Sequence, residues 1–266
     1  MQTIRPPAVA DMFYPRNPDE LHDMVQGFLD HVRAKGPAPK AIIVPHAGYI
    51  YSGPIAASAY ARISTAHDII KRVVLLGPAH RIPIGGLAVC SASAFATPLG
   101  DVRIDAASID EIIKLPQVQL IDAAHVAEHS LEVHLPFLQE ILDDFLLIPL
   151  VVGDAKPEEV AEVLEILWGG PETLIVISSD LSHYYDYDTA RQLDAATSKA
   201  IETLQPQDIQ YEHACGRIPV SGLLLLANKK GLRAQTIDLR NSGDTAGPRD
   251  QVVGYGAWVF EDQGQK

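Results

Sequence analysis

The sequence predicts a single three-layer α/β/α domain, residues 1–266, built on a mostly parallel central sheet. Its strongly apolar runs are short and continuous, as in strands that are buried on both faces of a parallel sheet. Segments with helical periodicity separate these runs, which favours strands that are joined by crossover helices. The chain also has no linker, low-complexity tract or internal repeat that would divide it.

Six apolar segments are predicted strands. Four of them form the predicted parallel core: 40–45, 71–78, 145–153 and 172–180. Two further segments, 233–239 and 252–260, could extend the sheet. In open α/β sheets ligands bind beyond the carboxyl ends of the strands, so functional residues are expected at that edge.

Two of the predicted helices begin with the same signals. Segment 17–32 offers Asn17 as a cap and Pro18 in the first turn, followed by apolar residues at helical spacing. Segment 154–170 repeats this design, because Pro157 is followed by acidic residues that suit the positive end of a helix. Both segments are therefore predicted to be amphipathic helices.

Two other helices are predicted with less regular signals. Segment 219–231 ends on a lysine pair and Gly231, which is a favourable C-terminal stop. Within segment 128–144, Pro136 either kinks one helix or starts a new one, because a proline removes a helical hydrogen bond.

The composition excludes several classes of protein. Hydrophobic residues make up 47% and charged residues 21% of the chain, which is not the balance of a disordered or coiled-coil protein. The formal charge of -13 argues against binding to nucleic acid or to an anionic membrane surface. The two cysteines lie far apart in sequence, the first residues contain no apolar leader, and no segment has the ~20 apolar residues of a membrane span. A cytoplasmic protein is expected.

Imidazole and carboxylate groups follow four of the predicted strands. His46 follows the first strand and His80 the second, while Asp180 and His183 follow the fourth and Asp244 comes after segment 233–239. If the strands are parallel, these side chains converge on one rim of the sheet. The sequence therefore predicts a site of two or three histidines and one or two carboxylates.

Each of these residues also has a purely structural interpretation. The histidines could belong to turns, Asp180 could cap the following helix, and Asp244 could be a turn residue. Because His46 and His80 follow neighbouring core strands, the ligand interpretation is favoured for this pair. Two histidines and one carboxylate suit non-haem Fe(II). Zinc would accept the same ligands and activate water, so both metals stay open at this point.

A separate group of histidines and glutamates lies in the segment HVAEHSLEVHLPF. Its spacing matches neither a zincin motif nor a zinc finger. If the segment is helical, Glu128 and Glu132 share one face, which could simply be solvated. Alternatively, His129 supplies an acid/base group or supports the metal site, because an imidazole transfers protons near neutral pH.

The two cysteines are predicted to be structural. Cys215 has His213 close in sequence, but neighbours two apart on a helix point in different directions, so a buried cysteine at a helix end is favoured. Cys90 follows an apolar run and is predicted to lie in the core. No nucleophile elbow, Walker loop or dinucleotide-binding glycine motif is present.

Eight ordered blocks resemble the Memo-like family (mediator of cell motility), whose bacterial and archaeal members are called AmmeMemoRadiSam system protein B. The blocks span about residues 5 to 260 and read RPPAVADMFYP, PKAIIVPHAGYIYSG, VVLLGPAH, TPLGDVRID, EHSLEVHLPFLQ, SSDLSHY, ACGRIP and NSGD with VVGYGAWVF. The resemblance implies a fold similar to the class III extradiol dioxygenases, which use a non-haem Fe(II).

The resemblance also implies a set of metal ligands. The histidines of the PHAGY and GPAH blocks are His46 and His80. Animal members of the family carry a cysteine ligand near the C-terminus, and Asp244 in NSGD is the residue expected in that position here. The predicted metal ligands are therefore His46, His80 and Asp244, with Fe(II) as the expected metal and copper or zinc as alternatives.

If the site belongs to an Fe(II)-dependent oxygenase, roles can be expected for the remaining site residues. His183 or His129 would move protons, and Asp180 would orient an imidazole. The substrate pocket would be lined by Tyr49, Tyr51 and Glu128.

Three functions follow from these observations. The first is an Fe(II)-dependent oxygenase or redox enzyme that acts on a small, catechol-like substrate. The second is a non-catalytic metal-binding adaptor that binds a peptide or a partner protein of a radical-SAM system. The third is a metal-dependent hydrolase, in which the metal lowers the pKa of bound water.

Overall fold

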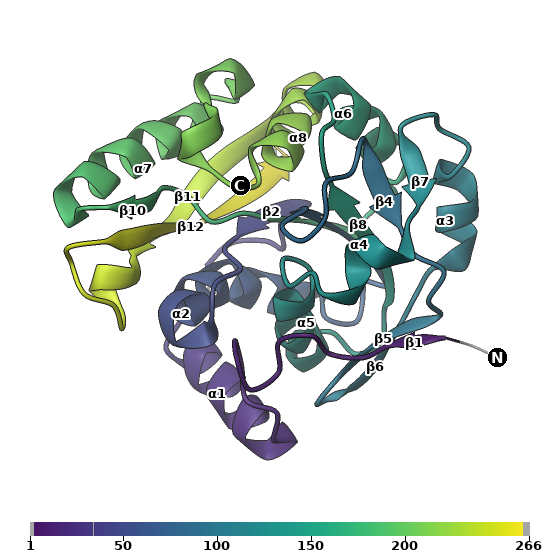
Figure 1. Cartoon of the computed structure of the whole chain (residues 1–266), viewed down its shortest axis with the longest axis horizontal. Coiled ribbons are helices and arrows are strands. Elements are labelled where there is room, and N and C mark those ends of the chain that lie inside the picture. Colours follow the sequence, from purple (N-terminus) through teal and green to yellow (C-terminus); the bar gives the residue numbers. More distant parts are fainter. Residues whose placement is uncertain (1–2, 34, 263–266) are drawn as a thin grey trace.

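In the computed structural model, which describes residues 3–33 and 35–262, a large mixed sheet lies between two groups of helices (Figure 1). The centre of the sheet consists of four parallel neighbours, listed here in spatial order: β2 (Ala41–Val44), β9 (Thr173–Ser178), β3 (Arg72–Pro78) and β8 (Leu146–Val152). These are the four strands that were predicted as the core. Almost every residue in them is buried, because helices cover both faces.

Antiparallel strands extend this core on both sides. On one side β12 (Val252–Asp262) pairs with β2, and β11 (Leu232–Asn241) and β10 (His183–Tyr185) pair with β12. The two predicted extending segments are thus confirmed. On the other side β4 (Leu87–Val89) pairs antiparallel with β8, and β7 (Val118–Leu120) pairs with β4. The sheet is therefore parallel at its centre and joined to antiparallel neighbours on both sides, while the outermost pair, β4 and β7, is again parallel.

A second, small sheet was not predicted. It contains β1 (Ile4–Arg5), β5 (Ala94–Thr97) and β6 (Gly100–Arg103), with β5 and β6 forming a hairpin. Gly100 in the turn has φ = 120°, a conformation that a residue with a side chain rarely adopts. This sheet anchors the N-terminal segment beside the helices of one layer (Figure 1).

The helices form two layers that cover the central sheet (Figure 1). One layer contains α1 (Pro18–Asp30), α2 (Tyr49–Tyr60) and α5 (Leu135–Ile141), which pack against one another. The other contains α6 (Pro157–Ile166) and α8 (Arg217–Lys230), which pack together, and α7 (Tyr187–Glu202), which packs on β11 and β12. The shorter helices are α3 (Ala106–Ile112), α4 (Asp122–Val126), η1 (Ala61–Ala66), η2 (Glu132–His134), η3 (Pro206–Asp208), η4 (Tyr211–His213) and η5 (Ser242–Asp244).

The predicted helix ends can be compared with the observed ones. The Asn17 side chain accepts hydrogen bonds from two amides of the first turn of α1, and Gly231 ends α8 in the left-handed conformation, as predicted. Pro136 lies in the first turn of α5, so it starts a new helix rather than kinking a long one. None of the helices in the described ranges has the length and apolar character needed to cross a bilayer.

Candidate metal centre

His46 lies at the carboxyl end of β2 and is buried, with 2% of its surface exposed. Its Nδ1 lies 2.6 Å from the hydroxyl oxygen of Ser178, at the end of the neighbouring strand β9. The Ser178 hydroxyl donates to the carbonyl oxygen of Ser130 at 2.6 Å. A carbonyl only accepts, so Ser178 must receive the Nδ1 proton of His46. This series of hydrogen bonds leaves Nε2 of His46 with a free lone pair.

The environment of His46 keeps its ring neutral. Burial is the main cause that lowers its pKa well below the usual value, and the neighbouring histidines, of which His80 has the largest effect, lower it further. A neutral imidazole with a fixed tautomer is the form that binds a metal. The sequence folds in this way because β2 and β9 are adjacent and in parallel register, with Val44 opposite Ser178.

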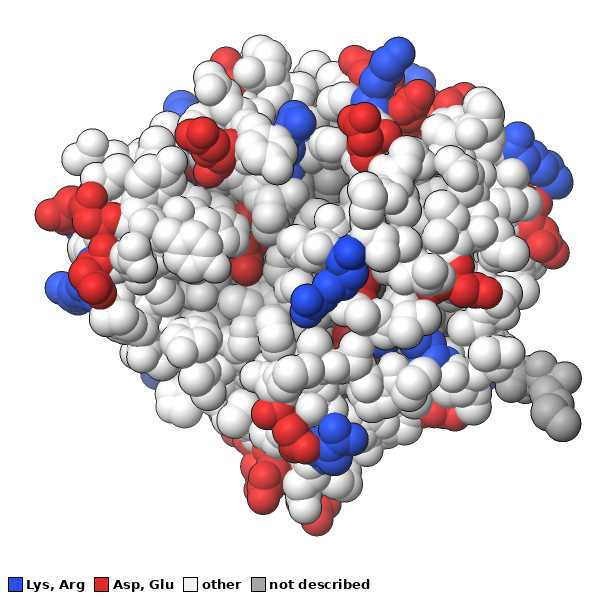
Figure 2. All heavy atoms as spheres, viewed as in Figure 1, with Lys and Arg blue, Asp and Glu red and all other residues white. Residues whose placement is uncertain are grey.

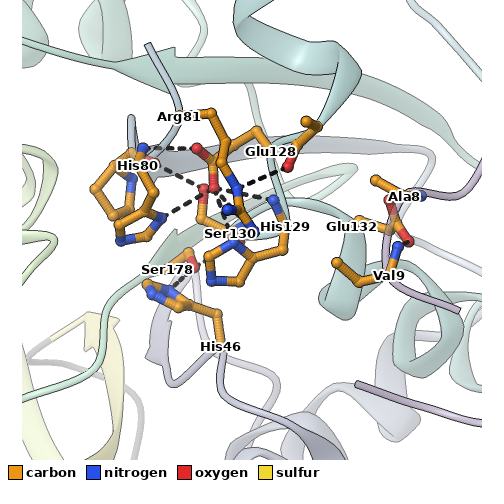
Figure 3. A network of polar contacts seen from close by, with 12 residues as sticks. Ala8, Val9, His46, His80, Arg81, Glu128, His129, Ser130, Glu132 and Ser178 are labelled. Carbon is orange, nitrogen blue, oxygen red and sulfur yellow. Dashed lines mark hydrogen bonds and ion pairs between the residues drawn. The ribbon is translucent and has the colours of Figure 1, made fainter. Parts of the chain in front are cut away.

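His80 follows β3 and is held by a buried carboxylate. Its backbone amide donates to Oε2 of Glu128 at 2.6 Å, and its Nδ1 lies 2.9 Å from Oε1 of the same residue. Figure 3 shows both contacts as dashed lines between His80 and Glu128. Because Nδ1 bonds to the carboxylate, Nε2 of His80 is left free. The His80 side chain is 28% exposed, so this ring faces the outside of the site.

Glu128 is ionised despite its burial. Burial alone would raise its pKa, but hydrogen bonds from the side chain and backbone of His80 and from the amide of Ser130 outweigh this effect and lower the pKa to about 2. The amides of His129 and Ser130 both donate to Oε1 at 2.9 Å. Glu128 is thus a support for His80 rather than a free ligand.

Cys215 supplies a third donor from a different part of the chain. It lies two residues before α8, and its Sγ lies 3.4 Å from Nε2 of His46. Burial raises the pKa of its thiol, with the nearby carboxylate of Asp180 as the next cause. The amide of Cys215 donates to the carbonyl oxygen of Asp180 at 3.3 Å, which fixes the residue beside His46.

Two groups of possible ligands share His80. In one group, donor atoms of His46, His80 and Cys215 all lie within 4.8 Å of one another, and in the other the same holds for His80, Glu128 and His129. The carboxylate of Glu128 already accepts several hydrogen bonds. His46, His80 and Cys215 each keep a nitrogen or sulfur atom that has no hydrogen bond or only a weak one and can bind a metal. The first group therefore fits a metal ion better.

Asp180 lies in the site, where it supports His46 instead of capping a helix. Its Oδ1 accepts the backbone amide of His46 at 2.8 Å, and its Oδ2 lies 3.9 Å from Nε2 of the same residue. Burial raises the pKa of Asp180 to about 7, although the amides of His46 and Ala47 oppose this change. The helix after this segment, α7, is capped by Asp186.

His129 completes a cluster of three imidazoles. Its ring centroid lies 4.7 Å from that of His80 and 5.5 Å from that of His46 (Figure 3). Burial lowers the pKa of His129 to about 4, and its buried Nδ1 lies 3.3 Å from Oε1 of Glu128 without a hydrogen bond of good geometry among the described residues. The ring is therefore neutral at pH 7 and close to both candidate ligands.

A cleft of about 850 Å³ opens beside these residues. His80, Cys215 and His183 contribute to its lining, together with the side chains of Arg81 and Arg217. Burial lowers the pKa of His183 below its usual value. Pockets of this size suit small molecules, and this one adjoins the cluster of donor atoms.

Three predicted site residues lie elsewhere or have other contacts. Asp244 is exposed in η5, where its carboxylate accepts the hydroxyl of Tyr187 at 2.5 Å, and it belongs to neither group of ligands. Tyr49 lies in the core, 2% exposed, and its hydroxyl donates to the carbonyl oxygen of Val133 at 2.6 Å. That position does not suit a pocket residue. Tyr51 is half-buried at the start of α2 and packs against the core.

Glu132 does not lie on a solvated helix face, which was one of the two interpretations of this segment. The segment around residues 128–131 is not helical, and Glu132 is fully buried. Its carboxylate pairs with Arg5 at 2.6 Å and accepts the hydroxyl of Tyr14 at 2.6 Å. Glu128 and Glu132 therefore have different roles, one beside the site and one tying the N-terminal segment to the core.

Cys215 is the residue that the spacing did not identify. Its neighbour in the structure is His46, which is far away in sequence. The ACGRIP block contained the signal, because it was one of the eight blocks of the family pattern. Ser178 was also missed as the partner of His46, although it lies in the SSD segment beside Asp180.

Comparisons with known proteins identify the fold and the family of this chain. An Escherichia coli K12 protein described as uncharacterised has a similar fold, with a TM-score of 0.51 over 82% of this chain and 98% of its own, at 11% identity. MEMO1 family proteins of Aquifex aeolicus and Ignicoccus hospitalis are 38% and 35% identical to this chain, each over 97% of its length and over 99% and 98% of their own. The family model for Memo-like proteins matches residues 5–259. The chain belongs to the Memo-like family.

Proposed function

We propose that this protein is a metal-dependent redox enzyme that holds one iron or copper ion through His46, His80 and Cys215 and acts on a small molecule in the adjoining cleft. One observation carries the proposal: three donor atoms converge within 4.8 Å, and two of them belong to imidazoles whose other nitrogens are held from outside. Such outer contacts are typical of metal-binding histidines.

The donor set bears on the choice of metal. Two imidazoles with a carboxylate would suit Fe(II), whereas a thiolate in place of the carboxylate makes the set softer. Iron remains a candidate with this set, and copper becomes a stronger one than the sequence indicated. A bound ion of either kind would supply one-electron chemistry, while zinc would supply a Lewis acid for hydrolysis.

The residues around the donors have separable tasks. Asp180 and Ser178 fix the position and tautomer of His46, and Glu128 does the same for His80. His129 lies against both rings, and its Nδ1 lies 3.3 Å from Oε1 of Glu128, a contact that can hold the imidazole in place, so we assign it proton exchange with the substrate. His183, on the cleft wall, is the second candidate for that role.

Metal uptake tests the centre directly. The protein would be reconstituted anaerobically with Fe(II), Cu(I) or Zn(II), and bound metal measured per chain. We expect one ion per chain in the wild type, loss of that ion in Cys215→Ser, and no loss in Cys90→Ala, whose cysteine is buried away from the site. Equal metal content in the two variants would contradict the assignment of Cys215.

Oxygen uptake and turnover then separate redox chemistry from hydrolysis. We expect iron- or copper-loaded protein to consume oxygen with an oxidisable substrate, and zinc-loaded protein to be inactive. His129→Gln should keep its metal and lose turnover. Activity with zinc alone would favour the hydrolase over the redox enzyme.

A binding function has one observation in its favour. Tyr211 is 80% exposed on the lining of the cleft, and Tyr184, next to His183, is 70% exposed. Exposed aromatic side chains of this kind are common in protein interfaces. A peptide or a radical-SAM-system protein could bind there without any metal. Retained binding of such a partner by the double variant His46→Ala, His80→Ala would favour this alternative.

A further inference from the structure

Two arginines line the cleft beside the donor cluster, and neither forms an ion pair with any residue that the structure describes. Arg81 donates from Nε to the carbonyl oxygen of Ala127 at 3.1 Å, which leaves its two terminal nitrogens free. Arg217, in the first turn of α8, stacks over Tyr211 with its guanidinium carbon 5.3 Å from the ring centroid. Both guanidinium groups can therefore donate to a ligand.

Unpaired arginines are unexpected in this cleft because the chain is strongly acidic, with a formal charge of -13. The two most buried arginines, Arg5 and Arg62, each pair with a carboxylate. Figure 2 shows basic side chains near the centre of the face that is viewed there, while acidic groups are most numerous toward its edge. The cleft thus offers guanidinium donors that the protein itself does not use.

Arg81 is also close to the proposed reaction centre. It follows His80 in sequence, and its positive charge is one of the causes that lower the pKa of His129. In Figure 3 its side chain extends across Glu128 and His129. A ligand that is held by Arg81 would therefore have its other end within reach of the donor cluster.

The balance of charges in the cleft favours a singly charged ligand. Asp154 and Glu212 also line it, so the two arginines face two carboxylates. Among residues 3–33 and 35–262, Glu212 is engaged only by the hydroxyl of Tyr185, at 3.4 Å. A dianion would be repelled more strongly by these carboxylates than a monoanion. The planar fork of a guanidinium matches the two oxygens of a carboxylate.

We propose that the cleft binds a small organic carboxylate, which Arg81 and Arg217 hold while the rest of the molecule reaches the centre formed by His46, His80 and Cys215. The inference rests on the proposed function only where it names this anion as the substrate. Binding of the anion depends on the two guanidinium groups and not on the metal.

Fluorine NMR titrations of the full chain test the proposal with 4-fluorobenzoate and its neutral counterpart 4-fluorobenzamide. We expect saturable binding of the benzoate to wild type, with or without metal, and about tenfold weaker binding of the amide, as for loss of one charge-assisted contact. Arg81→Gln and Arg217→Gln should each weaken benzoate binding by about fivefold to tenfold. Arg191→Gln is the matched control, because Arg191 stacks on Tyr187 at 5.6 Å and is not part of the cleft lining.

Metal content is measured on the same samples. Loss of benzoate binding in the arginine variants, with normal metal content, supports the proposal. Equal binding of benzoate and benzamide overturns it, as does unchanged binding in both arginine variants. Tighter binding of inorganic phosphate than of benzoate would overturn the choice of a carboxylate. If wild type takes up no metal, the proposed redox function fails, yet the titration of metal-free protein still decides whether the anion site exists.

Discussion

His80 and Glu128 are joined by two hydrogen bonds. The backbone amide of His80 lies 2.6 Å from one carboxylate oxygen of Glu128, and the imidazole of His80 lies 2.9 Å from the other. The carboxylate also accepts two amides of its own loop, at 2.9 Å each. This arrangement fixes the ring orientation and the tautomer of His80 at once. Glu128 should therefore govern metal affinity although it does not offer a free ligand atom.

Replacing Glu128 by Gln is expected to weaken metal binding by about tenfold to a hundredfold, the usual effect of losing a partner that orients a ligand. The amide keeps one acceptor oxygen but cannot accept both bonds from His80. Competition with a chromophoric chelator would measure the metal dissociation constant. Glu140→Gln is the control, since Glu140 forms a His–Glu contact with His22 at 2.9 Å outside the site. Equal affinities in the two variants would contradict the role given to Glu128.

Glu132→Gln should affect stability instead of metal binding. The change leaves the buried guanidinium of Arg5 without a counter-charge, which costs about 3–5 kcal/mol in the free energy of unfolding. Urea denaturation would measure it. Asp11→Asn removes the exposed pair between Asp11 and Arg16 and should leave the free energy of unfolding almost unchanged. A metal dissociation constant that changes more in Glu132→Gln than in Glu128→Gln would refute this division of roles.

The central strands and the positions of His46 and His80 could be predicted because they depend on local patterns. A continuous apolar run identifies a buried strand, and its carboxyl end identifies the edge where a side chain can reach a ligand. Asp180 was placed at the site by the same reasoning. The support that it gives to the amide of His46 could not be foreseen, because that contact joins residues 134 positions apart.

Other parts of the site depend on contacts that have no local pattern. Glu128 lies in irregular backbone between two helices, so helical spacing gave the wrong face for its neighbour Glu132. Cys215 reaches His46 across 169 positions. The small sheet was missed for a similar reason, since Ile4 in β1 pairs with Ala94 in β5 and both strands are very short.

The buried ring of His125 predicts a loss of stability in acid. Its pKa is lowered to about 4, mainly by burial and also by the charge of Arg5, while its hydrogen bond to the carbonyl of Ala88 opposes the change. Between the unfolded value near ~6.5 and this folded value, the unfolded chain binds a proton that the folded chain does not. Stability should therefore fall as the pH drops from about 6.5 to 4, with a contribution of about 3 kcal/mol from this ring.

Urea titrations at several pH values check this expectation. In His125→Gln the slope of stability against pH should be reduced by about one proton over that range. His22→Gln provides the comparison, because its exposed ring pairs with Glu140 and its pKa is raised, so its loss should not flatten the slope. An unchanged slope in His125→Gln would show that the ring does not titrate differently in the two states.

Gly77 in β3 packs against Ser130, a residue that bonds both to Ser178, the partner of His46, and to Glu128, the partner of His80. A substitution at Gly77 therefore tests the geometry of the whole metal centre. A methyl group added there would lie 2.7 Å from Oγ of Ser130 and 2.9 Å from Cδ2 of Leu131. Ser130 accepts the hydroxyl of Ser178 and donates its amide to Glu128, so moving it disturbs both outer contacts. Gly77→Ala should lower the free energy of unfolding by about 1–3 kcal/mol, as overpacking does, and weaken metal binding as well.

Gly85→Ala is the matched change, because a methyl group at Gly85 meets no atom within 4 Å. Both variants would be measured by urea denaturation and by metal competition. If Gly77→Ala loses stability but binds metal as tightly as Gly85→Ala, then the position of Ser130 does not determine the orientation of the ligands. A parallel loss of both properties would support a centre whose geometry is set by the packing of β3 against the loop that contains Ser130.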